Sequence, residues 1–483
     1  MALVLIGFMG AGKTTAARAA GGVDADDLVE QRLGEQIATY FEREGEAKFR
    51  EVEEEVVLEL LGGRSEVVAL GGGALASPRV RDALADHTVA WLDVDIETAW
   101  DRVSSAANRP LARDRDTFEA RFAERQPLYA AVADAFVDGA PLDADALAAL
   151  ESLRPGERLL WSRVHPVWFE RPYDERPGDF VVSDENVAPL HAPGAYAIAA
   201  GEEHKTLASA ELLWREMARQ GLTRSGRVVA VGGGVVGDLA GFCASAYQRG
   251  VPVVHVPTTL VAQVDSAYGG KTGVDLPEAK NYVGAYHQPQ SVHVLSARLR
   301  TLPAAERAAG YAEVVKTALI AGGELWQRVR DGAVDDADVV LHCARTKLAV
   351  VAADERDGGR RQVLNLGHTI GHAIETVTGY GRYRHGEAVA LGLLAALRLS
   401  ELGELRAEVA ELLAAQGLPT RLVDADADAV LAATYRDKKR IGGDGPPYVL
   451  VAAPGEVSYG HEVGDDRVRA AIAELAGLQG SPA

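Results

Sequence analysis

Short apolar segments alternate with longer amphipathic ones along the first two thirds of the chain. The apolar segments predict strands at residues 3–6, 67–70, 89–92, 180–183, 228–231 and 253–256. Helical patterning lies between them, for example at residues 15–20 and 209–220. Strands that alternate with helices are typical of an α/β fold built on a mostly parallel sheet.

From about residue 302 the pattern changes to long helical segments. These segments are expected at residues 304–320, 339–353, 368–378, 386–402 and 405–416. Residues 138–155 are small and acidic, and we interpret them as a last helix followed by a linker. With 483 residues, the chain is long enough for about three domains. We expect two α/β domains, at residues 1–155 and 156–302, and a mainly α-helical domain at 303–483.

The composition excludes a largely disordered protein and a membrane-spanning helix. Hydrophobic residues make up 47% of the chain and charged residues 25%, as in ordinary globular proteins. The longest apolar run, residues 388–397, is about half of the roughly 20 residues that a transmembrane helix needs. Glycines interrupt the apolar start, so we expect no secretory signal. Cys243 and Cys343 are expected to be buried thiols in the reducing cytoplasm.

The formal net charge of −20 opposes binding to nucleic acid or to an anionic membrane. Anionic substrates would therefore need local clusters of basic residues. Only nine of the 50 basic residues are lysines: Lys13, Lys48, Lys205, Lys271, Lys280, Lys316, Lys347, Lys438 and Lys439. A lysine that persists in such an arginine-rich chain suggests a position that needs a compact ammonium group, although chance alone can explain any single one.

The segment Gly7–Thr14 fits the phosphate-binding loop pattern, with a predicted strand before it and a helix after it. The predicted ATP-binding residues are Gly7, Gly10, Ala11, Gly12, Lys13, Thr14 and Thr15. Backbone N–H groups of such a loop converge on phosphate oxygens, Lys13 would reach the β- and γ-phosphates, and Thr14 would ligate Mg²⁺. The alternative is a glycine-rich turn without a ligand.

Three later features indicate which kind of molecule accepts the phosphate. Asp24 and Asp26 could lie on one side of a strand end, Arg50 follows Phe49, and a glycine triplet follows the strand at 67–70. Together they resemble the shikimate kinase family over residues 1–155. The resemblance assigns shikimate binding to Asp26, Arg50, Gly71, Gly72, Gly73 and Arg125. It makes Asp24 a supporting residue of the Mg²⁺ site and Arg109 the lid arginine over the transferred phosphate.

One departure from this family concerns the helix after the phosphate-binding loop. Only eleven positions separate Lys13 from Asp24, fewer than is usual for the family. The helix is therefore expected to be shorter by more than a turn. This difference bears on the efficiency of phosphoryl transfer and leaves the reaction class unchanged.

The second half contains a candidate dinucleotide site and a candidate metal site. The segment Gly232–Asp238 follows a predicted strand, and its glycines would allow a pyrophosphate to approach closely. His368 and His372 are four residues apart on one predicted helix face, with His385 and Glu313 elsewhere in the chain. Two or three histidines with a carboxylate are typical of a catalytic zinc site. A ligand-free turn and a chance histidine pair are the alternatives.

Seven segments of the second half resemble the 3-dehydroquinate synthase family over residues 160–475. They are Val256–Leu260, Gln263–Ser266, Gly269–Thr272, Lys280–Asn281, Ala312–Lys316, Asn365–His368 and His385–Glu387. The resemblance implies that NAD⁺ is held by Asp184, Asn186, Glu202, Lys205, Gly234, Val235, Val236, Gly237, Asp238, Thr258, Thr259, Lys271 and Lys280. It implies that the substrate is held by Arg249, Asp265, Lys271, Lys280, Asn281, Lys316, Lys347, Arg361, Asn365, His372, His385 and Lys438 or Lys439.

The same resemblance makes Glu313, His368 and His385 the ligands of one Zn²⁺ or Co²⁺ and places His372 beside the substrate phosphate. The residues expected to act in catalysis are Lys13 and Arg109 in the first half and Asp265, Lys271, Lys316, Arg361 and His372 in the second. Seven or eight of the nine lysines thus fall at ligand positions.

The two resemblances imply a bifunctional enzyme that uses ATP with Mg²⁺ in one half and NAD⁺ with a divalent metal in the other. The substrates would be small molecules, with neither nucleic acid nor membrane as a partner, and the second half would be the place for a homodimer contact. Alternatives are a metal-dependent polyol dehydrogenase or a related sugar-phosphate cyclase in the second half and a nucleotide sensor in the first. The lysines at 271 and 280 argue against a polyol substrate, which needs no cation cluster.

Overall fold

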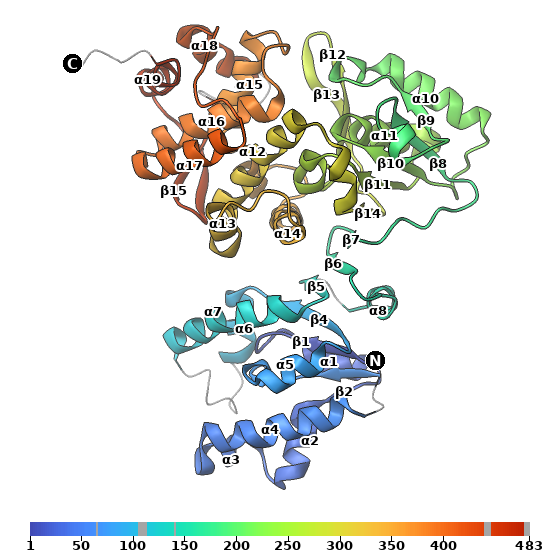
Figure 1. Ribbon diagram of the computed structural model, residues 1–483, viewed down its shortest axis with the longest axis vertical. Helices are drawn as coiled ribbons and strands as arrows, with labels where there is room; N and C mark the ends of the chain where they lie inside the picture. The colour runs from blue at the N-terminus through green and yellow to red at the C-terminus, as the bar shows by residue number, and fades with distance from the viewer. Residues whose placement is uncertain (64–65, 105–113, 140–141, 439–445, 478–483) are drawn as a thin grey trace. The chain divides into compact units, whose positions relative to one another are not determined.

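The computed structural model describes residues 1–63, 66–104, 114–139, 142–438 and 446–477. The chain forms two compact units, Met1–Arg171 and Pro172–Ala483, coloured from blue to cyan and from green to red in Figure 1. Among the residues described, none of the helices combines the length and the apolar character that a membrane span requires.

The first unit is built on a sheet with the strand order β2-β3-β1-β4-β5-β6-β7. Its strands are β1 (Leu3–Ile6), β2 (Val23–Asp24), β3 (Val67–Ala69), β4 (Thr88–Asp93), β5 (Ala135–Asp138), β6 (Arg158–Ser162) and β7 (Pro166–Phe169). Its helices are α1 (Lys13–Ala19), α2 (Ala25–Leu33), α3 (Ile37–Glu44), α4 (Glu46–Leu61), η1 (Ala74–Ala76), α5 (Pro78–Leu84), α6 (Ile96–Ser104), α7 (Arg115–Val132) and α8 (Ala144–Glu151). Neighbouring strands are parallel except for β6 and β7, which form an antiparallel hairpin.

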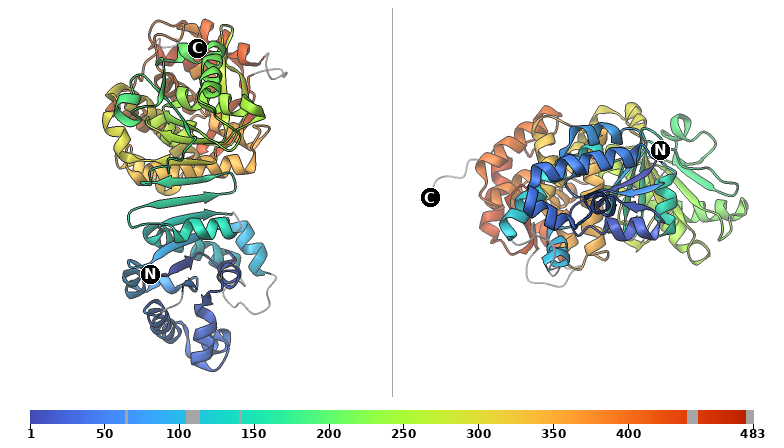
Figure 2. Two further views of the ribbon diagram at one scale, coloured as in Figure 1. Left: turned by 90° about the vertical axis from the view of Figure 1, so that its right-hand side faces the viewer. Right: turned by 90° about the horizontal axis from the view of Figure 1, so that it is seen from below.

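The β6–β7 hairpin is an integral part of this first unit. Strand β6 pairs in parallel with β5, and Figure 2 shows the hairpin alongside that strand. Leu159 of β6 is fully buried in the same core cluster as Leu150 and Leu153. The Arg171 guanidinium lies 4.0 Å from the ring centroid of Trp168 and pairs with the Glu157 carboxylate. The sequence pattern predicted neither of these strands.

The second unit begins with a five-stranded parallel sheet of order β14-β11-β10-β8-β9. Its strands are β8 (Phe180–Asp184), β9 (Tyr196–Ile198), β10 (Val228–Gly232), β11 (Val253–Pro257) and β14 (Ser291–Val294), and β12 (Lys271–Leu276) with β13 (Ala279–Tyr286) form a separate antiparallel hairpin. Its helices are α9 (Ala188–His191), η3 (Glu202–His204), α10 (Leu207–Arg219), α11 (Gly234–Ala246), η4 (Tyr247–Arg249), η5 (Ala262–Ser266) and η6 (Ser296–Thr301).

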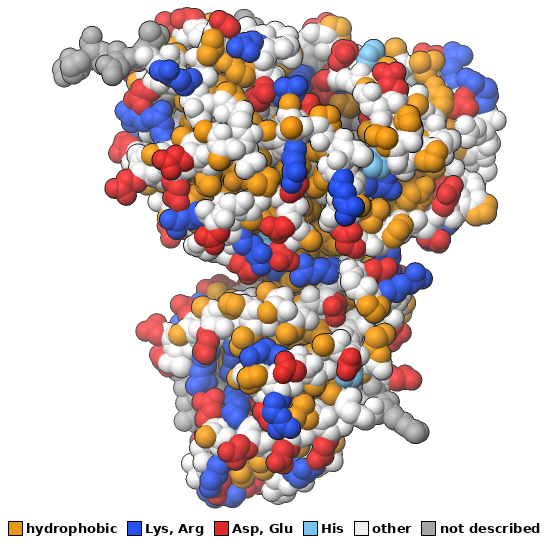
Figure 3. Space-filling view, viewed as in Figure 1, with side chains coloured by type: hydrophobic (Ala, Val, Ile, Leu, Met, Phe, Trp, Pro, Cys, Tyr) orange, Lys and Arg blue, Asp and Glu red, His pale blue; other side chains and the backbone are white. Residues whose placement is uncertain are grey.

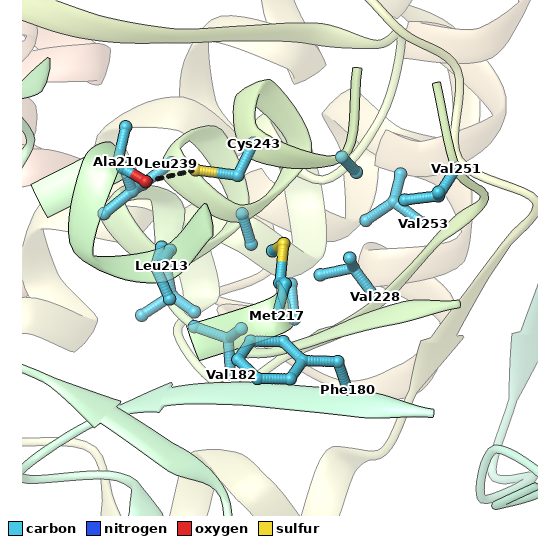
Figure 4. Packing of buried hydrophobic residues seen from close by; sticks show 14 of the residues in the cluster. Phe180, Val182, Ala210, Leu213, Met217, Val228, Leu239, Cys243, Val251 and Val253 are labelled. Carbon is cyan, nitrogen blue, oxygen red and sulfur yellow. Dashed lines mark hydrogen bonds between the residues drawn. The ribbon is translucent and has the colours of Figure 1, made fainter. Parts of the chain in front are cut away.

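Both faces of this parallel sheet are buried. Val228 of β10 packs with residues such as Met217 of α10 and Cys243 of α11 on one face (Figure 4). Val229 and Val231, which alternate with it along the strand, pack on the opposite face. The Cys243 thiol donates to the carbonyl of Ala210 across 3.8 Å. Both cysteines are free and buried, which confirms the expectation from the sequence.

The last part of the second unit is mainly helical. Its helices are α12 (Ala304–Ala321), α13 (Gly323–Arg330), α14 (Ala337–Ala353), η7 (Arg360–Asn365), α15 (His368–Val377), α16 (His385–Leu399), α17 (Gly403–Ala415), α18 (Ala427–Lys438) and α19 (Asp465–Leu475), with a two-stranded sheet of β15 (Tyr448–Ala453) and β16 (Glu456–His461). Helix α16 is almost entirely buried and packs against α12, α15, α17 and α19.

The structure confirms the α/β class with a mainly helical last part. The six strands predicted from the sequence are present and agree with the observed bounds to within one residue at each end. The predicted helices differ from the observed ones by at most three residues at an end. Helix α1 has seven residues, in agreement with the short helix expected after the phosphate-binding loop.

Candidate active sites

The loop between β1 and α1 is shaped by glycines in a conformation that other residues disfavour. Gly7, Gly10 and Gly12 have φ angles of 144°, 82° and 90°. The ammonium of Lys13 donates to the carbonyl oxygens of Gly7 and Phe8, at 2.8 and 3.1 Å. The lysine therefore folds back over the loop, on the side where phosphate oxygens would bind. The other predicted ATP-binding residues, Ala11, Thr14 and Thr15, lie in this loop and in the first turn of α1.

The glycine triplet after β3 leaves room for three charged side chains. A Cβ atom at Gly71 would lie 2.5 Å from Oε1 of Glu53 and 2.9 Å from Oδ1 of Asp26. A Cβ atom at Gly73 would overlap the guanidinium of Arg50. Glycine is needed here because functional groups occupy the space that a side chain would fill.

The middle glycine lies between Arg125 and the phosphate-binding loop. A Cβ atom at Gly72 would be 3.4 Å from Nη1 of Arg125 and 3.5 Å from the carbonyl oxygen of Gly7. The hydroxyl of Tyr129 donates to the Gly72 carbonyl at 2.6 Å, and the Arg125 guanidinium lies 5.6 Å from the ring centroid of Phe8. The candidate acceptor site thus adjoins the candidate ATP site, as phosphoryl transfer requires.

The two arginines of this site differ in their charge environment. Arg50 pairs with Glu46 and Glu53, and although burial alone would lower the pKa of Arg50, the two carboxylates raise it. Burial, together with the charges of Arg50 and Arg121, lowers the pKa of Arg125. An anionic ligand would relieve this repulsion. Glu53 was not predicted as a site residue. It follows Arg50 by three positions on one helix face, and this spacing is typical of an ion pair.

The prediction that Asp24 and Asp26 share one side of a strand end is wrong. Strand β2 ends at Asp24, which caps α2 by accepting from the backbone N–H of Asp26 at 3.0 Å. Asp26 lies in the first turn of α2, and helical geometry there turns its side chain toward Gly71. Arg109, the predicted lid arginine, lies outside the described residues.

In the second unit, the glycine-rich turn after β10 opens helix α11. The predicted NAD⁺-binding residues Gly234, Val235, Val236, Gly237 and Asp238 occupy the first turns of this helix, and Gly233 is its N-cap. A Cβ atom at Gly233 would lie 2.9 Å from Cγ2 of Thr259, and one at Gly237 would lie 3.2 Å from Nδ1 of His255. Close packing against β11 therefore requires glycine at the turn.

Two buried hydroxyls beside this turn have no hydrogen-bond partner among the described residues, those of Thr258 and Ser266. The Ser266 hydroxyl would lie 3.2 Å from a Cβ atom at Gly234. Buried polar groups normally find a partner, so the pair indicates a ligand with polar atoms at the turn. Ser266 was not predicted as a site residue, although it lies in a segment that the sequence analysis singled out.

Lys205 connects several predicted NAD⁺-binding residues. Its buried ammonium lies 2.6 Å from Glu202, 3.3 Å from Asp238 and 3.8 Å from Asp275, and it donates to Oδ1 of Asn281 at 2.7 Å. Burial raises the pKa of Asp238 to about 6, against the opposing effect of Lys205. The carboxylate of Asp238 is therefore poised to change its protonation state near neutral pH.

Two glycines of α16 bring the predicted metal ligands together. A Cβ atom at Gly386 would overlap the carbonyl of Ala309 on α12, and one at Gly392 would overlap the carbonyl of Gly367. Because glycine has no side chain at these two positions, α16 lies directly against α12 and against the start of α15. The three helices carry the predicted ligands Glu313 (α12), His368 (α15) and His385 (α16), and α15 also carries His372, which is expected beside the substrate phosphate.

The ligand atoms of these residues converge. Nε2 of His368 lies 3.6 Å from Oε1 of Glu313, and Nε2 of His385 lies 3.4 Å from the same oxygen. Each of the three histidines, His372 included, offers a ring nitrogen within 4.8 Å of those of the other two. The structure therefore places all four residues of the predicted metal and phosphate site at one point.

The donor set fits a divalent transition metal. Both carboxylate oxygens of Glu313 are buried; Oε1 faces His368 and His385, and Oε2 is in ion-pair contact with Lys316. Nδ1 of His368 lies 3.1 Å from the carbonyl oxygen of Leu366, which leaves Nε2 free to face Glu313. Imidazole nitrogens with one carboxylate suit Zn²⁺ and Co²⁺.

Next to the metal site, two lysines share the carboxylate of Asp265. Lys316 donates to Oδ2 at 2.9 Å and Lys347 to Oδ1 at 2.6 Å. Burial alone would raise the pKa of Asp265, but the two ammonium groups lower it well below its usual value. Arg361, also buried, donates to the carbonyl of Gly269 at 2.9 Å. Lys316, Lys347 and Arg361 still outnumber the carboxylates of Asp265 and Glu313, and this excess of positive charge fits an anionic substrate.

The remaining predicted residues lie in more exposed surroundings. Lys271 pairs with Asp357, and Lys280 lies 3.3 Å from Glu375. Arg249, Asn365 and Asn186 are exposed, and Asp184 accepts from the backbone N–H of Asn186 at 2.9 Å. The backbone of Lys438 ends α18, and Lys439 lies outside the described residues. Glu375 was not predicted, although it follows His368 and His372 at positions seven and three residues later on the same helix face.

Outside these sites the surface charge is mixed. Figure 3 shows basic and acidic side chains interspersed on the face in view. The net charge of −20 is therefore not gathered into one acidic patch on that face.

The sequence matches two known families along its length. Residues 9–153 match shikimate kinase, residues 195–309 match the N-terminal part of 3-dehydroquinate synthase, and residues 310–440 match its C-terminal part. The 3-dehydroquinate synthase of Symbiobacterium thermophilum is 43% identical over 316 residues, which cover 60% of this chain and 88% of that protein. That of Halorhodospira halophila is 47% identical over 290 residues, covering 54% and 80%.

Solved structures of other cyclases share the fold of the second unit. A 2-deoxy-scyllo-inosose synthase, solved with carbaglucose-6-phosphate, NAD⁺ and Co²⁺, has a TM-score of 0.57 and 25% identity over 66% of this chain and all of its own. The 2-epi-5-epi-valiolone synthase of Streptomyces hygroscopicus, solved with NAD⁺ and Zn²⁺, has a TM-score of 0.56 and 25% identity over 62% of this chain and 90% of its own.

These matches agree with the two sites. The phosphate-binding loop and the arginines around Gly72 lie in the region that matches shikimate kinase. The glycine turn, the histidines and Glu313 lie in the region that matches the synthase. The chain belongs to the 3-dehydroquinate synthase family and carries a shikimate kinase domain at its N-terminal end, an arrangement consistent with a bifunctional enzyme of the shikimate pathway.

Proposed function

We propose that the chain catalyses two reactions. The first domain phosphorylates shikimate to shikimate 3-phosphate with ATP. The other two convert 3-deoxy-D-arabino-heptulosonate 7-phosphate to 3-dehydroquinate with release of phosphate. The proposed domains are residues 1–155 for the kinase, 156–302 for NAD⁺ binding and 303–483 for binding of the metal and the substrate. Residues 156–171, with the β6–β7 hairpin, belong to the compact unit of the kinase.

In the kinase, the residues around the glycine triplet hold the acceptor. Arg50 and Arg125 bind the carboxylate of shikimate through paired N–H groups, and Asp26 accepts from a ring hydroxyl. Glu53 keeps Arg50 in place through their ion pair. Lys13 neutralises the transferred phosphate, with Mg²⁺ held by Thr14 and supported by Asp24.

In the synthase, the cofactors are NAD⁺ and one Zn²⁺ or Co²⁺. The cyclases with the same fold bind these cofactors, and Glu313, His368 and His385 offer a fitting donor set. When bound, NAD⁺ accepts and returns a hydride, and the cation polarises a substrate hydroxyl. The first turns of α11, together with Lys205 and Thr258, hold the dinucleotide.

The chain's own charged groups orient the sugar phosphate. Lys316, Lys347 and Arg361 form a buried cationic wall beside the metal ligands, and His372 faces the same point as these ligands. Preorganised cations of this kind stabilise charge that develops in the transition state without having to reorganise. They bind the carboxylate and the phosphate of the substrate and keep both fixed during ring closure.

One observation carries this assignment. Lys316, Lys347 and Arg361 lie buried beside the carboxylates of Asp265 and Glu313, next to the convergent His368 and His385. With Glu313 engaged as a metal ligand, the three cations exceed the one remaining carboxylate, and an anionic substrate would balance this costly buried charge. A neutral polyol, the substrate of the alternative dehydrogenase, would supply no negative charge.

The proposal is tested with two assays on the purified full chain. One follows inorganic phosphate released from the linear sugar acid phosphate with NAD⁺ and Zn²⁺ present. The other follows ATP-dependent phosphorylation of shikimate with Mg²⁺ present. Turnover in both assays is expected. A folded chain with all cofactors bound that released no phosphate from this sugar, but turned over another sugar phosphate, would assign the second half to a related cyclase.

The surroundings of these reactions complete the proposal. We place the protein in the cytoplasm, where two free buried cysteines remain reduced. Its partners are small-molecule substrates, and a homodimer would form through the synthase half. Light scattering coupled to size-exclusion chromatography measures the oligomeric state directly.

A further inference from the structure

Glu375 lies next to two residues of the proposed synthase site, His385 and Lys280, without a role in any of the assignments above. It is on α15, and its side chain is only 4% exposed. A buried carboxylate is stable only when it is paired. Its two oxygens face two different partners, His385 and Lys280.

On one side, Oε2 of Glu375 lies 3.4 Å from Nδ1 of His385. The other ring nitrogen of this histidine, Nε2, is the one that lies 3.4 Å from Glu313. The two nitrogens are on opposite edges of the ring, so Glu375 is behind the imidazole as seen from the metal site. A carboxylate in that place accepts the Nδ1 proton and leaves the lone pair of Nε2 directed at the cation.

On the other side, Oε1 of Glu375 lies 3.3 Å from the ammonium of Lys280 on β13. The same ammonium lies 4.4 Å from the ring centroid of Tyr380. Tyr380 is held in the turn after α15 by its hydroxyl, 3.1 Å from that of Thr376, and by a backbone N–H bond to the Glu375 carbonyl. Lys280 is thus seated between a carboxylate and an aromatic face.

We propose that Glu375 is a positioning residue that fixes a metal ligand and a substrate lysine relative to each other. The proposal rests on the function proposed above for the synthase site. Through one oxygen, Glu375 sets the orientation of the His385 ring. Through the other, it holds Lys280 beside the metal site. Loss of this one carboxylate therefore weakens both metal binding and substrate binding.

The first test measures Zn²⁺ affinity of the full chain by competition with a chromophoric chelator. Glu375→Gln keeps the shape of the side chain but loses the anionic acceptor. We expect Zn²⁺ to bind roughly 10- to 100-fold more weakly, the usual effect of losing such a partner. Glu306→Gln is the matched control, because Glu306 pairs with Arg384, the residue before His385, but contacts no proposed ligand. Its Zn²⁺ affinity should match that of the unchanged chain.

A second readout separates positioning from a general loss of structure. In the Co²⁺-loaded protein, the visible absorption band reports ligand geometry per bound ion. It should shift in Glu375→Gln and remain unchanged in Glu306→Gln. Lys280→Met should raise the KM for the sugar phosphate several-fold while leaving Zn²⁺ affinity within about twofold, because His385 keeps its partner.

Each outcome decides the proposal. Thermal unfolding of the metal-free proteins establishes that the variants are folded. Glu375→Asp retains the charge but is too short to reach both partners, so its Zn²⁺ affinity should also fall. Zn²⁺ affinity and a Co²⁺ spectrum unchanged in folded Glu375→Gln would overturn the proposal. Failure of the proposed function would look different, because the unchanged chain itself would then release no phosphate from the sugar phosphate.

Discussion

The ammonium of Lys316 on α12 lies 2.9 Å from Oδ2 of Asp265, which belongs to η5 beside the parallel sheet. Lys316 is also in ion-pair contact with Glu313, a proposed metal ligand one helical turn before it. The bond therefore joins the nucleotide side of the synthase unit to its metal side through buried charges. A change in one member of this network leaves another member unpaired.

Asp265→Asn should destabilise the chain as well as inactivate the synthase. The change removes the charge that Lys316 and Lys347 share while leaving both ammonium groups buried. Breaking a buried ion pair by removing one partner typically costs about 3–5 kcal/mol. Chemical denaturation, with the transition of the synthase unit followed by circular dichroism, measures the loss. A midpoint equal to that of the unchanged chain would mean that water or anions already neutralise the two lysines.

Lys13→Ala should abolish phosphoryl transfer to shikimate and leave cyclisation nearly unchanged. Lys13 belongs to the loop of the first unit, and every proposed synthase residue belongs to the second. The two activities are measured on the same purified variant. Arg18→Ala, an exposed change in the same helix that removes a surface ion pair with Asp27, is a control that should fold equally well and keep both activities. Loss of cyclisation in a folded Lys13→Ala chain would contradict the assignment of one site to each unit.

Removal of divalent metal with a strong chelator should stop cyclisation. The histidines and Glu313 converge on one point, and a divalent cation bound there would polarise the substrate hydroxyl. Readdition of Zn²⁺ or Co²⁺ after the chelator is removed should restore phosphate release, and Mg²⁺ alone should restore only the kinase. Metal content is measured by atomic emission. Cyclisation by a chain with no bound metal would refute the Glu313, His368 and His385 site.

In the synthase assay NAD⁺ should be required but not consumed. The hydride leaves and returns within one visit to the site, so one phosphate should appear per turnover without any accumulating absorbance of free NADH. Lys271→Ala removes a cation that would contact a charged substrate group. We expect a loss of about 2–4 kcal/mol in transition-state stabilisation, read from kcat/KM. Stoichiometric NADH release with a neutral polyol would instead support a dehydrogenase.

The affinity for NAD⁺ should fall as the pH falls through about 6. The folded-state pKa of Asp238 is raised by burial to about 6, so its carboxylate, which we propose accepts a hydrogen bond from the dinucleotide, becomes protonated in this range. Asp238→Asn should bind more weakly and without this pH dependence, as measured by calorimetry between pH 5 and 8. In the free protein, the folding stability should change with pH in the opposite direction to the NAD⁺ affinity. Because the folded state binds the proton more tightly than the unfolded chain, stability should decrease as the pH rises from about 4 to 6.

Local patterns in the sequence predicted the elements that carry both sites. The apolar runs that became β1 and β10 each precede a glycine-rich turn, and strand, turn and helix are encoded within about fifteen residues. The spacing of His368 and His372 likewise follows from helical geometry alone. These features need no knowledge of distant contacts.

What the sequence did not reveal depends on contacts between distant segments. Glu375 is an ordinary helical carboxylate until α16 brings His385 beside it, and Ser266 is unremarkable until the glycine turn approaches it. Asp26 was misplaced because β2 has only two residues, too few for an alternating pattern to predict its end. The short strands β6 and β7 gave equally little periodicity.

The β6–β7 hairpin has a consequence for how this gene could be divided in evolution. Its strand β6 covers the edge of β5, and Leu159 completes the core beneath it, although the match to shikimate kinase ends at residue 153. A gene split at that point would remove Leu159 from the core of the first unit and expose the apolar residues that it covers. A split after Arg171 would keep this core whole, so a separated kinase descended from this chain would be expected to carry a terminal hairpin as a mark of its fused ancestor.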